Sequence, residues 1–134
     1  MVSLDDVARM ATGLPEVVEI EQRGSRAWAV PGATKSGGAK VFAWERPFSK
    51  ADIRRYGAEP PPDGPILAIR VADLHEKEAV LAENPDAFFT IPHFDGYAAV
   101  LVRLDAATDG ALREALLDGW RACAPPELAD RYRP

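Results

Sequence analysis

The chain of 134 residues contains one cysteine and two histidines. A single thiol, Cys123, cannot form an intrachain disulfide or supply a thiolate cluster for a metal ion. Because it lies near the end of a predicted apolar helix, we expect a small buried residue rather than a nucleophile. A zinc site needs three or four well-placed ligands, which neither His75-Glu76-x-Glu78 nor His93-x-Asp95 provides. We therefore predict no metal and no cofactor.

The sequence also lacks long apolar runs and catalytic signatures. No apolar stretch approaches the roughly 18 residues of a membrane span, and the N-terminus lacks the basic and apolar regions of a secretory signal. The serines lie outside any nucleophile-elbow pattern, and the loop 34–38 lacks the Gly-Lys-Ser/Thr ending of a Walker motif. We expect a cytoplasmic monomer that contacts no membrane and has no catalytic activity.

The hydrophobic pattern predicts a single domain over residues 1–134 with mixed helices and strands. Ser3 with Asp6, and Asp73 with Glu76, form capping patterns before two helices. Strands follow strands without a regular strand–helix repeat, which favours an α+β fold with a mostly antiparallel sheet and helices on one face. The expected order is helix 4–12, strands 18–20, 26–30 and 40–44, short helix 51–56, strand 66–71, helix 73–83, strands 88–91 and 98–104, a long helix beginning at 108 or 109, and a helical turn over 127–132.

Charge is distributed unevenly along the chain. Residues 22–58, which we call the basic segment, carry eight basic and two acidic residues, a local net charge of +6, whereas the whole chain has a formal charge of −5. The remainder of the chain therefore carries −11. A positive segment in an acidic protein points to a negatively charged partner. Nucleic acid is one such partner, provided that the charges gather on one face.

The basic segment supplies the candidate binding residues. Lys35, in a loop rich in glycine and serine, is a candidate for phosphate contact. Trp44 and Trp28 offer stacking surfaces if they are exposed. The alternative is a solvated face whose charges pair with the acidic remainder of the chain, each pair contributing only about 0–1 kcal/mol. The residues predicted to bind nucleic acid are Lys35, Lys40, Lys50, Arg54, Arg55 and Trp44.

The strand over 40–44 is apolar on both sides. Strict alternation places Phe42 and Trp44 on one face and Val41 and Ala43 on the other, as in a central strand covered on both sides. We expect Phe42 in the core. An exposed aromatic patch containing Trp28, Trp44 or Phe94 would instead favour a protein-interaction or adaptor role.

Several segments, spread over nearly the whole chain and in the same order, resemble the MmcQ/YjbR family. They include the strand Gly38-Ala39-Lys40-Val41-Phe42-Ala43 and the hairpin segment His93-Phe94-Asp95-Gly96-Tyr97. The others are Leu14-Pro15-Glu16-Val17, Asn84-Pro85-Asp86-Ala87-Phe88-Phe89, Val100-Leu101-Val102-Arg103-Leu104 and Gly119-Trp120-Arg121-Ala122-Cys123-Ala124-Pro125.

The resemblance implies a CyaY-like α+β protein, related in shape to frataxin, and a DNA-binding role. The sequence departs from the family pattern at Pro126-Glu127, where many members have a lysine after the Ala-Pro pair. Our hypothesis is a non-catalytic module that binds DNA phosphates with little base reading. A weaker alternative is a metal or small-ligand binder, because frataxin relatives bind iron weakly through an acidic ridge and this chain has an acidic N-terminal third.

Overall fold

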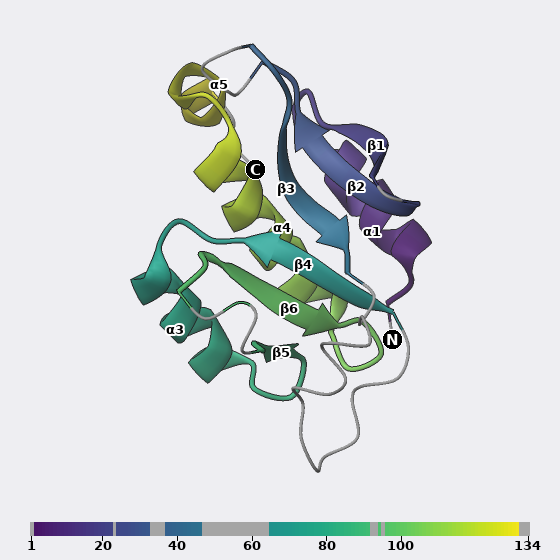
Figure 1. Ribbon diagram of the computed structural model, residues 1–134, viewed down its shortest axis with the longest axis vertical. Helices are drawn as coiled ribbons and strands as arrows, with labels where there is room; N and C mark the ends of the chain where they lie inside the picture. Colours follow the sequence, from purple (N-terminus) through teal and green to yellow (C-terminus); the bar gives the residue numbers. More distant parts are fainter. Residues whose placement is uncertain are drawn as a thin grey trace.

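The computed structural model describes residues 2–22, 24–32, 37–46, 65–91, 94 and 96–131. The short helix predicted over 51–56, and most of the proline-rich loop before residue 66, lie outside these residues. The described elements (Figure 1) are α1 (Leu4–Thr12), β1 (Val18–Gln22), β2 (Ser25–Val30), β3 (Lys40–Glu45), β4 (Ile66–Arg70), α3 (Leu74–Glu83), β5 (Phe88–Phe89), β6 (Ala99–Arg103), α4 (Asp109–Cys123) and α5 (Pro126–Arg131).

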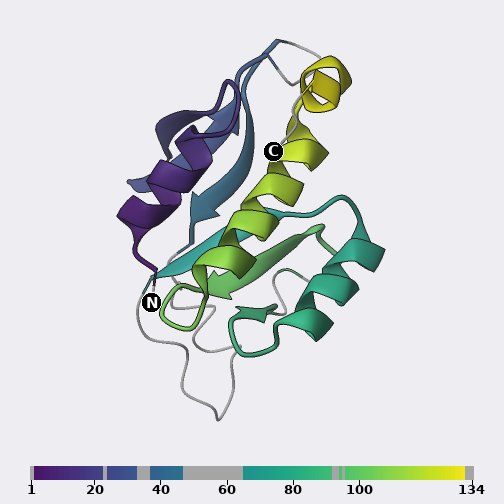
Figure 2. The ribbon, with the colours of Figure 1, turned by 180° about the vertical axis from the view of Figure 1, so that it is seen from behind.

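The described strands form one six-stranded sheet in the order β1-β2-β3-β4-β6-β5, and every neighbouring pair is antiparallel. Helices α1, α3 and α4 cover one face of this sheet (Figure 2). The predicted α+β class, with a mostly antiparallel sheet and helices on one face, is confirmed. We call the covered side the helix face and the opposite side the open face.

The helices begin where the capping patterns predict. The Ser3 hydroxyl accepts a hydrogen bond from the Asp6 amide at 3.1 Å, and the Asp6 carboxylate accepts one from the Ser3 amide at 2.9 Å. The Asp73 carboxylate accepts from the amide of Glu76, and the Thr108 hydroxyl accepts from Ala111. Each cap satisfies an amide that has no partner inside its helix, and so fixes where that helix starts.

The core lies between the sheet and the helices. It contains both fully buried tryptophans, Trp28 on β2 and Trp120 on α4. The indole of Trp28 donates to Glu19 Oε1, and that of Trp120 donates to the Pro15 carbonyl, each at 3.1 Å. The exposure that Trp28 would need as a stacking surface is therefore absent, because no part of its ring is accessible. A buried indole needs a hydrogen-bond acceptor, and Glu19 on the neighbouring edge strand supplies it.

A β-bulge in β3 changes the predicted faces of that strand. Trp28 pairs with Ala43, whereas the next residue, Ala29, pairs with Val41, so Phe42 is the extra residue. Phe42 and Ala43 therefore both join the core on the helix face, and Trp44 packs against the cluster on the open face. The prediction that Phe42 and Trp44 share a face is wrong because a bulge interrupts the two-residue period. The expectation of Phe42 in the core is confirmed.

Candidate functional site

The strand register places three arginines on the open face. Trp44, Ala68, Leu101 and Phe89 form one row across β3, β4, β6 and β5. Ile66 pairs with Arg103, and the Arg46 amide donates to the Ile66 carbonyl at 2.8 Å, so Arg46 and Arg103 flank Ile66. Arg70 pairs with Ala99 beyond the other side of the row. Because side chains alternate along a strand, these arginines lie on the same face as Trp44 and Phe89.

Four aromatic rings lie among these arginines. Trp44 lies 6.5 Å from both Phe94 and Tyr97, measured between ring centroids, and Phe94 meets Tyr97 edge-on at 5.4 Å. Phe94 is 3% exposed, Trp44 is partly buried, and Tyr97 is 37% exposed. The edge-to-face geometry is favourable for aromatic pairs. Phe94 is thus buried within the cluster, whereas the ring of Tyr97 is exposed to solvent.

Each arginine lies over a ring. The guanidinium of Arg70 is 5.5 Å from the Trp44 ring centre and 5.4 Å from that of Tyr97, and its Nε donates to the Val41 carbonyl at 2.7 Å. Arg46 lies over Phe94 at 5.6 Å, and Arg103 lies over Phe89 at 5.9 Å. Such contacts attract the cation electrostatically to the face of the ring. We call these seven residues, Arg46, Arg70, Arg103, Trp44, Phe89, Phe94 and Tyr97, the arginine–aromatic face.

A buried lysine holds the segment that carries two of the rings. Lys77 on α3 is only 6% exposed, and its ammonium donates to the carbonyls of Phe94 at 2.7 Å and Tyr97 at 2.9 Å. A buried ammonium without acceptors would be costly, and these two carbonyls satisfy it. Lys77 therefore positions Phe94 and Tyr97 against the sheet from the side of α3.

The described members of the basic segment do not share one face. Trp44 and Arg46 lie on the open face, whereas Lys40 pairs with Val30, a member of the core on the helix face. Arg26 also belongs to the helix face, because its guanidinium binds Asp5 on α1. The predicted site residues Lys35, Lys50, Arg54 and Arg55 lie outside the described residues, and their role stays a prediction.

The charge of Arg26 is neutralised locally. Its Nε and Nη2 donate to the two carboxylate oxygens of Glu19 at 3.1 and 3.0 Å, and Nη1 donates to Asp5 at 2.9 Å. The hydrogen bond from Arg26 lowers the pKa of Glu19, and the bonds to Glu19 and then Asp5 raise the pKa of Arg26. Two carboxylates around one guanidinium leave no net positive charge there, so Arg26 stabilises the edge of the sheet instead of attracting an anion.

Sequence reasoning missed Arg70, Arg103 and Tyr97 because they lie outside the basic segment. The alternation in Ile66-Leu67-Ala68-Ile69-Arg70 already indicates that Arg70 faces the same way as Ile66 and Ala68. The placement of β4 between β3 and β6, which brings the three arginines onto one face, has no local signal because it depends on the order of strands in the sheet.

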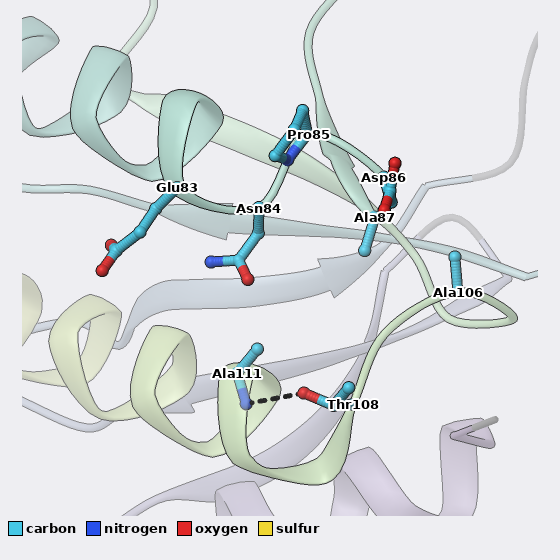
Figure 3. Close-up of a pocket in the computed structure, with 8 residues that line it drawn as sticks. All are labelled: Glu83, Asn84, Pro85, Asp86, Ala87, Ala106, Thr108 and Ala111. Carbon is cyan, nitrogen blue, oxygen red and sulfur yellow. Dashed lines mark hydrogen bonds between the residues drawn. The ribbon is translucent and has the colours of Figure 1, made fainter.

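The structure also contains a hollow, which we considered as a ligand site. A hollow of about 180 Å³ lies between the end of α3 and the start of α4 (Figure 3), lined by Glu83, Asn84, Pro85, Asp86, Ala87, Ala106, Thr108 and Ala111. Ligand pockets usually measure about 300–1,000 Å³, so this hollow is small for an organic ligand.

The titratable groups that the structure describes are equally unpromising as a reactive centre. In that part of the chain, no three histidine, cysteine or acidic side chains gather as metal ligands would. Burial raises the pKa of the Cys123 thiol, which disfavours the nucleophilic thiolate. Among the described helices, none combines the length and apolar character needed to cross a membrane.

Comparison with known proteins places the chain among relatives of undefined activity. Uncharacterised proteins of Mycobacterium tuberculosis and Mycobacterium bovis are each 41% identical over 135 residues, which cover 98% of this chain and 96% of the relative. The crystal structure of Deinococcus radiodurans protein DR2400, a DUF419 domain, aligns with a TM-score of 0.62 at 18% identity, over 90% of this chain and 78% of that chain. No family model matches the chain. The structural likeness establishes a shared fold.

Proposed function

This protein belongs to the same family as these mycobacterial proteins, and we propose that it is a non-catalytic binding protein for nucleic acid. The observation that supports this proposal is the arginine–aromatic face. Two described strand residues on the open face, Arg70 and Arg103, are arginines, and Arg46 directly follows β3 on the same face. No described strand residue on this face is acidic, since Glu19, Glu21 and Glu45 belong to the opposite side of the sheet. We propose further that the family is MmcQ/YjbR, to which DUF419 is related. We also propose that the protein acts in the cytoplasm as a monomer.

The distribution of charge makes a local contact reasonable in a protein of net charge −5. At physiological salt the Debye length is about 8 Å, so repulsion from acidic groups farther than this from a bound phosphate is largely screened, whereas the arginines in contact with the phosphate attract it. The expected affinity is therefore modest and strongly dependent on salt. Each phosphate contact adds about −0.9 to the slope of log K against log salt for a duplex.

The test is a salt titration of fluorescently labelled duplex DNA with two matched double variants. Arg70→Gln with Arg103→Gln removes two charges from the open face. Arg113→Gln with Arg121→Gln removes two charges from exposed positions on α4. We expect the first pair to weaken binding and to flatten the salt slope by about 1.8, and the second pair to bind like the unmodified protein. Undetectable binding of both this duplex and a single strand of equal length at low salt, or equal effects of the two pairs, would refute the proposal.

The basic segment provides a separate arm of the same titration. Changing Lys35, Arg54 and Arg55 together to alanine removes the charges that the sequence predicts to contact phosphates. We expect weaker binding and a flatter slope if these residues extend the interface beyond the arginine–aromatic face. Unchanged binding would restrict the interface to the sheet and overturn the predicted role of these three residues.

The adaptor alternative has less support. Of the rings on which it depends, Trp28 and Phe94 are buried, and only Trp44 is partly accessible. The exposed large apolar residues of the described chain, Val18, Leu74 and Tyr97, come from β1, α3 and the segment before β6. A docking surface for another protein would need a larger contiguous apolar patch.

A further inference from the structure

We infer that the arginine–aromatic face takes single-stranded rather than duplex nucleic acid, with an unpaired base stacked against the exposed ring of Tyr97. This inference rests on the proposed function and narrows its ligand. It depends on three features: the exposed ring, the arginine beside it, and the bonds that fix both.

The ring positions favour stacking. Among the aromatic side chains that the structure describes, only Tyr97 is exposed, and Trp44 beside it is partly accessible. Proteins that bind single strands place aromatic side chains on a sheet so that successive bases stack on them. In a duplex the bases already stack on each other, so only phosphates and groove edges are available to such a face.

Arg70 adds a contact of the right charge at the same place. Its Nε bonds to the Val41 carbonyl, and its four Nη hydrogens make no hydrogen bond within the part of the chain that the structure describes. A guanidinium that lies within 5.5 Å of the centres of both the Trp44 and the Tyr97 rings can donate to a phosphate oxygen while a base stacks nearby.

The spacing of the arginines sets the extent of the contact. Arg46 and Arg103 lie two strands apart, about 10 Å, and Arg70 lies four residues along β4 from their row, about 13 Å. Three phosphate contacts on a single strand predict a slope of log K against log salt of about −2.

The face is also fixed before a ligand arrives. Lys77 holds the Phe94 and Tyr97 carbonyls, and the Val41 carbonyl holds Arg70. Side chains that are already ordered cost less entropy on binding, which compensates for the small number of contacts. The arrangement suits a short flexible strand that adapts its backbone to fixed rings and charges.

The experiment compares a labelled oligo-dT single strand with a duplex of equal length at low salt, using the intact protein and two variants. Tyr97→Leu removes the ring and keeps an apolar side chain, and Tyr97→Phe keeps the ring as the matched control. One stacked base contributes about 1–3 kcal/mol, so Tyr97→Leu should weaken single-strand binding about 5- to 150-fold. Tyr97→Phe should bind like the unmodified protein.

Intrinsic fluorescence locates the strand. Trp28 and Trp120 are fully buried, so quenching by a bound strand should come from Trp44 and should disappear in Trp44→Phe. If neither probe binds, the proposed function itself fails. If the duplex binds as tightly as the single strand, or if Tyr97→Leu binds the single strand normally, the proposed function stands and this inference is wrong.

Discussion

Replacing Gly119 with alanine should destabilise the protein, although the same change favours an ordinary helix. Gly119 lies in the middle of α4, where this helix crosses the sheet. An added Cβ would lie 2.9 Å from the Ile69 Cγ2 methyl and 3.0 Å from the Arg70 carbonyl oxygen. The second contact is with backbone, which cannot rotate away. The substitution therefore pushes α4 away from β4 at Arg70, whose side chain lies on the opposite face of the sheet.

Two opposing effects set the magnitude. Alanine is more favourable than glycine in a helix interior by about 0.8–1.0 kcal/mol. Overpacking a tight site costs about 1–3 kcal/mol. The net expectation is a loss of up to about 2 kcal/mol in the free energy of unfolding, measured by urea denaturation monitored by circular dichroism.

Gly110 in the same helix is the matched control. It is exposed, and an added Cβ there meets nothing within 4 Å. Gly110→Ala should therefore gain up to about 1 kcal/mol from helix propensity alone. If Gly119→Ala is as stable as the unmodified protein, or is stabilised like Gly110→Ala, the close contact between α4 and β4 does not constrain the fold and the reasoning is wrong.

Three further predictions concern the caps, the buried lysine and the backbone. The hydrogen bonds around Asp6, first that from the Ser3 amide, lower its pKa from 3.8 to about 2. The stabilising effect of Asp6 is therefore complete above pH 3.8 and is lost as pH falls through about 2. The free energy of unfolding of Asp6→Asn, measured in urea, should equal that of the unmodified protein only at the lowest pH. Lys77→Met leaves two carbonyls without their ammonium donor and should cost roughly 1–3 kcal/mol in the same assay, and an unchanged urea midpoint would contradict the positioning role. Glu16 has a φ of 62°, so Glu16→Gly should be about 1 kcal/mol more stable than Glu16→Ala; the usual order, with alanine the more stable, would show that the left-handed backbone there is not maintained.

The sequence predicts the elements well because their signals are local. Caps such as Ser3 and Asp73 act within one turn, and strand alternation acts within five or six residues. The bulge at Phe42 has no comparable signal, because it is defined by pairing with β2 and by the helix that covers it. One extra residue was enough to separate Phe42 from Trp44.

The candidate site was only partly predictable for the same reason. The basic segment runs through β2 and β3, and the alternation of side chains along each strand places Arg26 on the helix face and Arg46 on the open face. Arg46 then lies on the same face as Arg103, from a strand far along the chain, because both flank Ile66 on β4, which lies between β3 and β6. Trp28 and Trp44 are alike in sequence, and their different exposure follows from which face the helices cover.

The most direct test of the central claim is a titration of isotopically labelled protein with a short single-stranded oligonucleotide, followed by two-dimensional amide NMR. We predict that shifts concentrate at Trp44, Arg70, Tyr97 and Arg103 on the open face, while α1 and α4 stay unchanged. Shifts concentrated on α1 or α4, or no shifts at low salt, would contradict it.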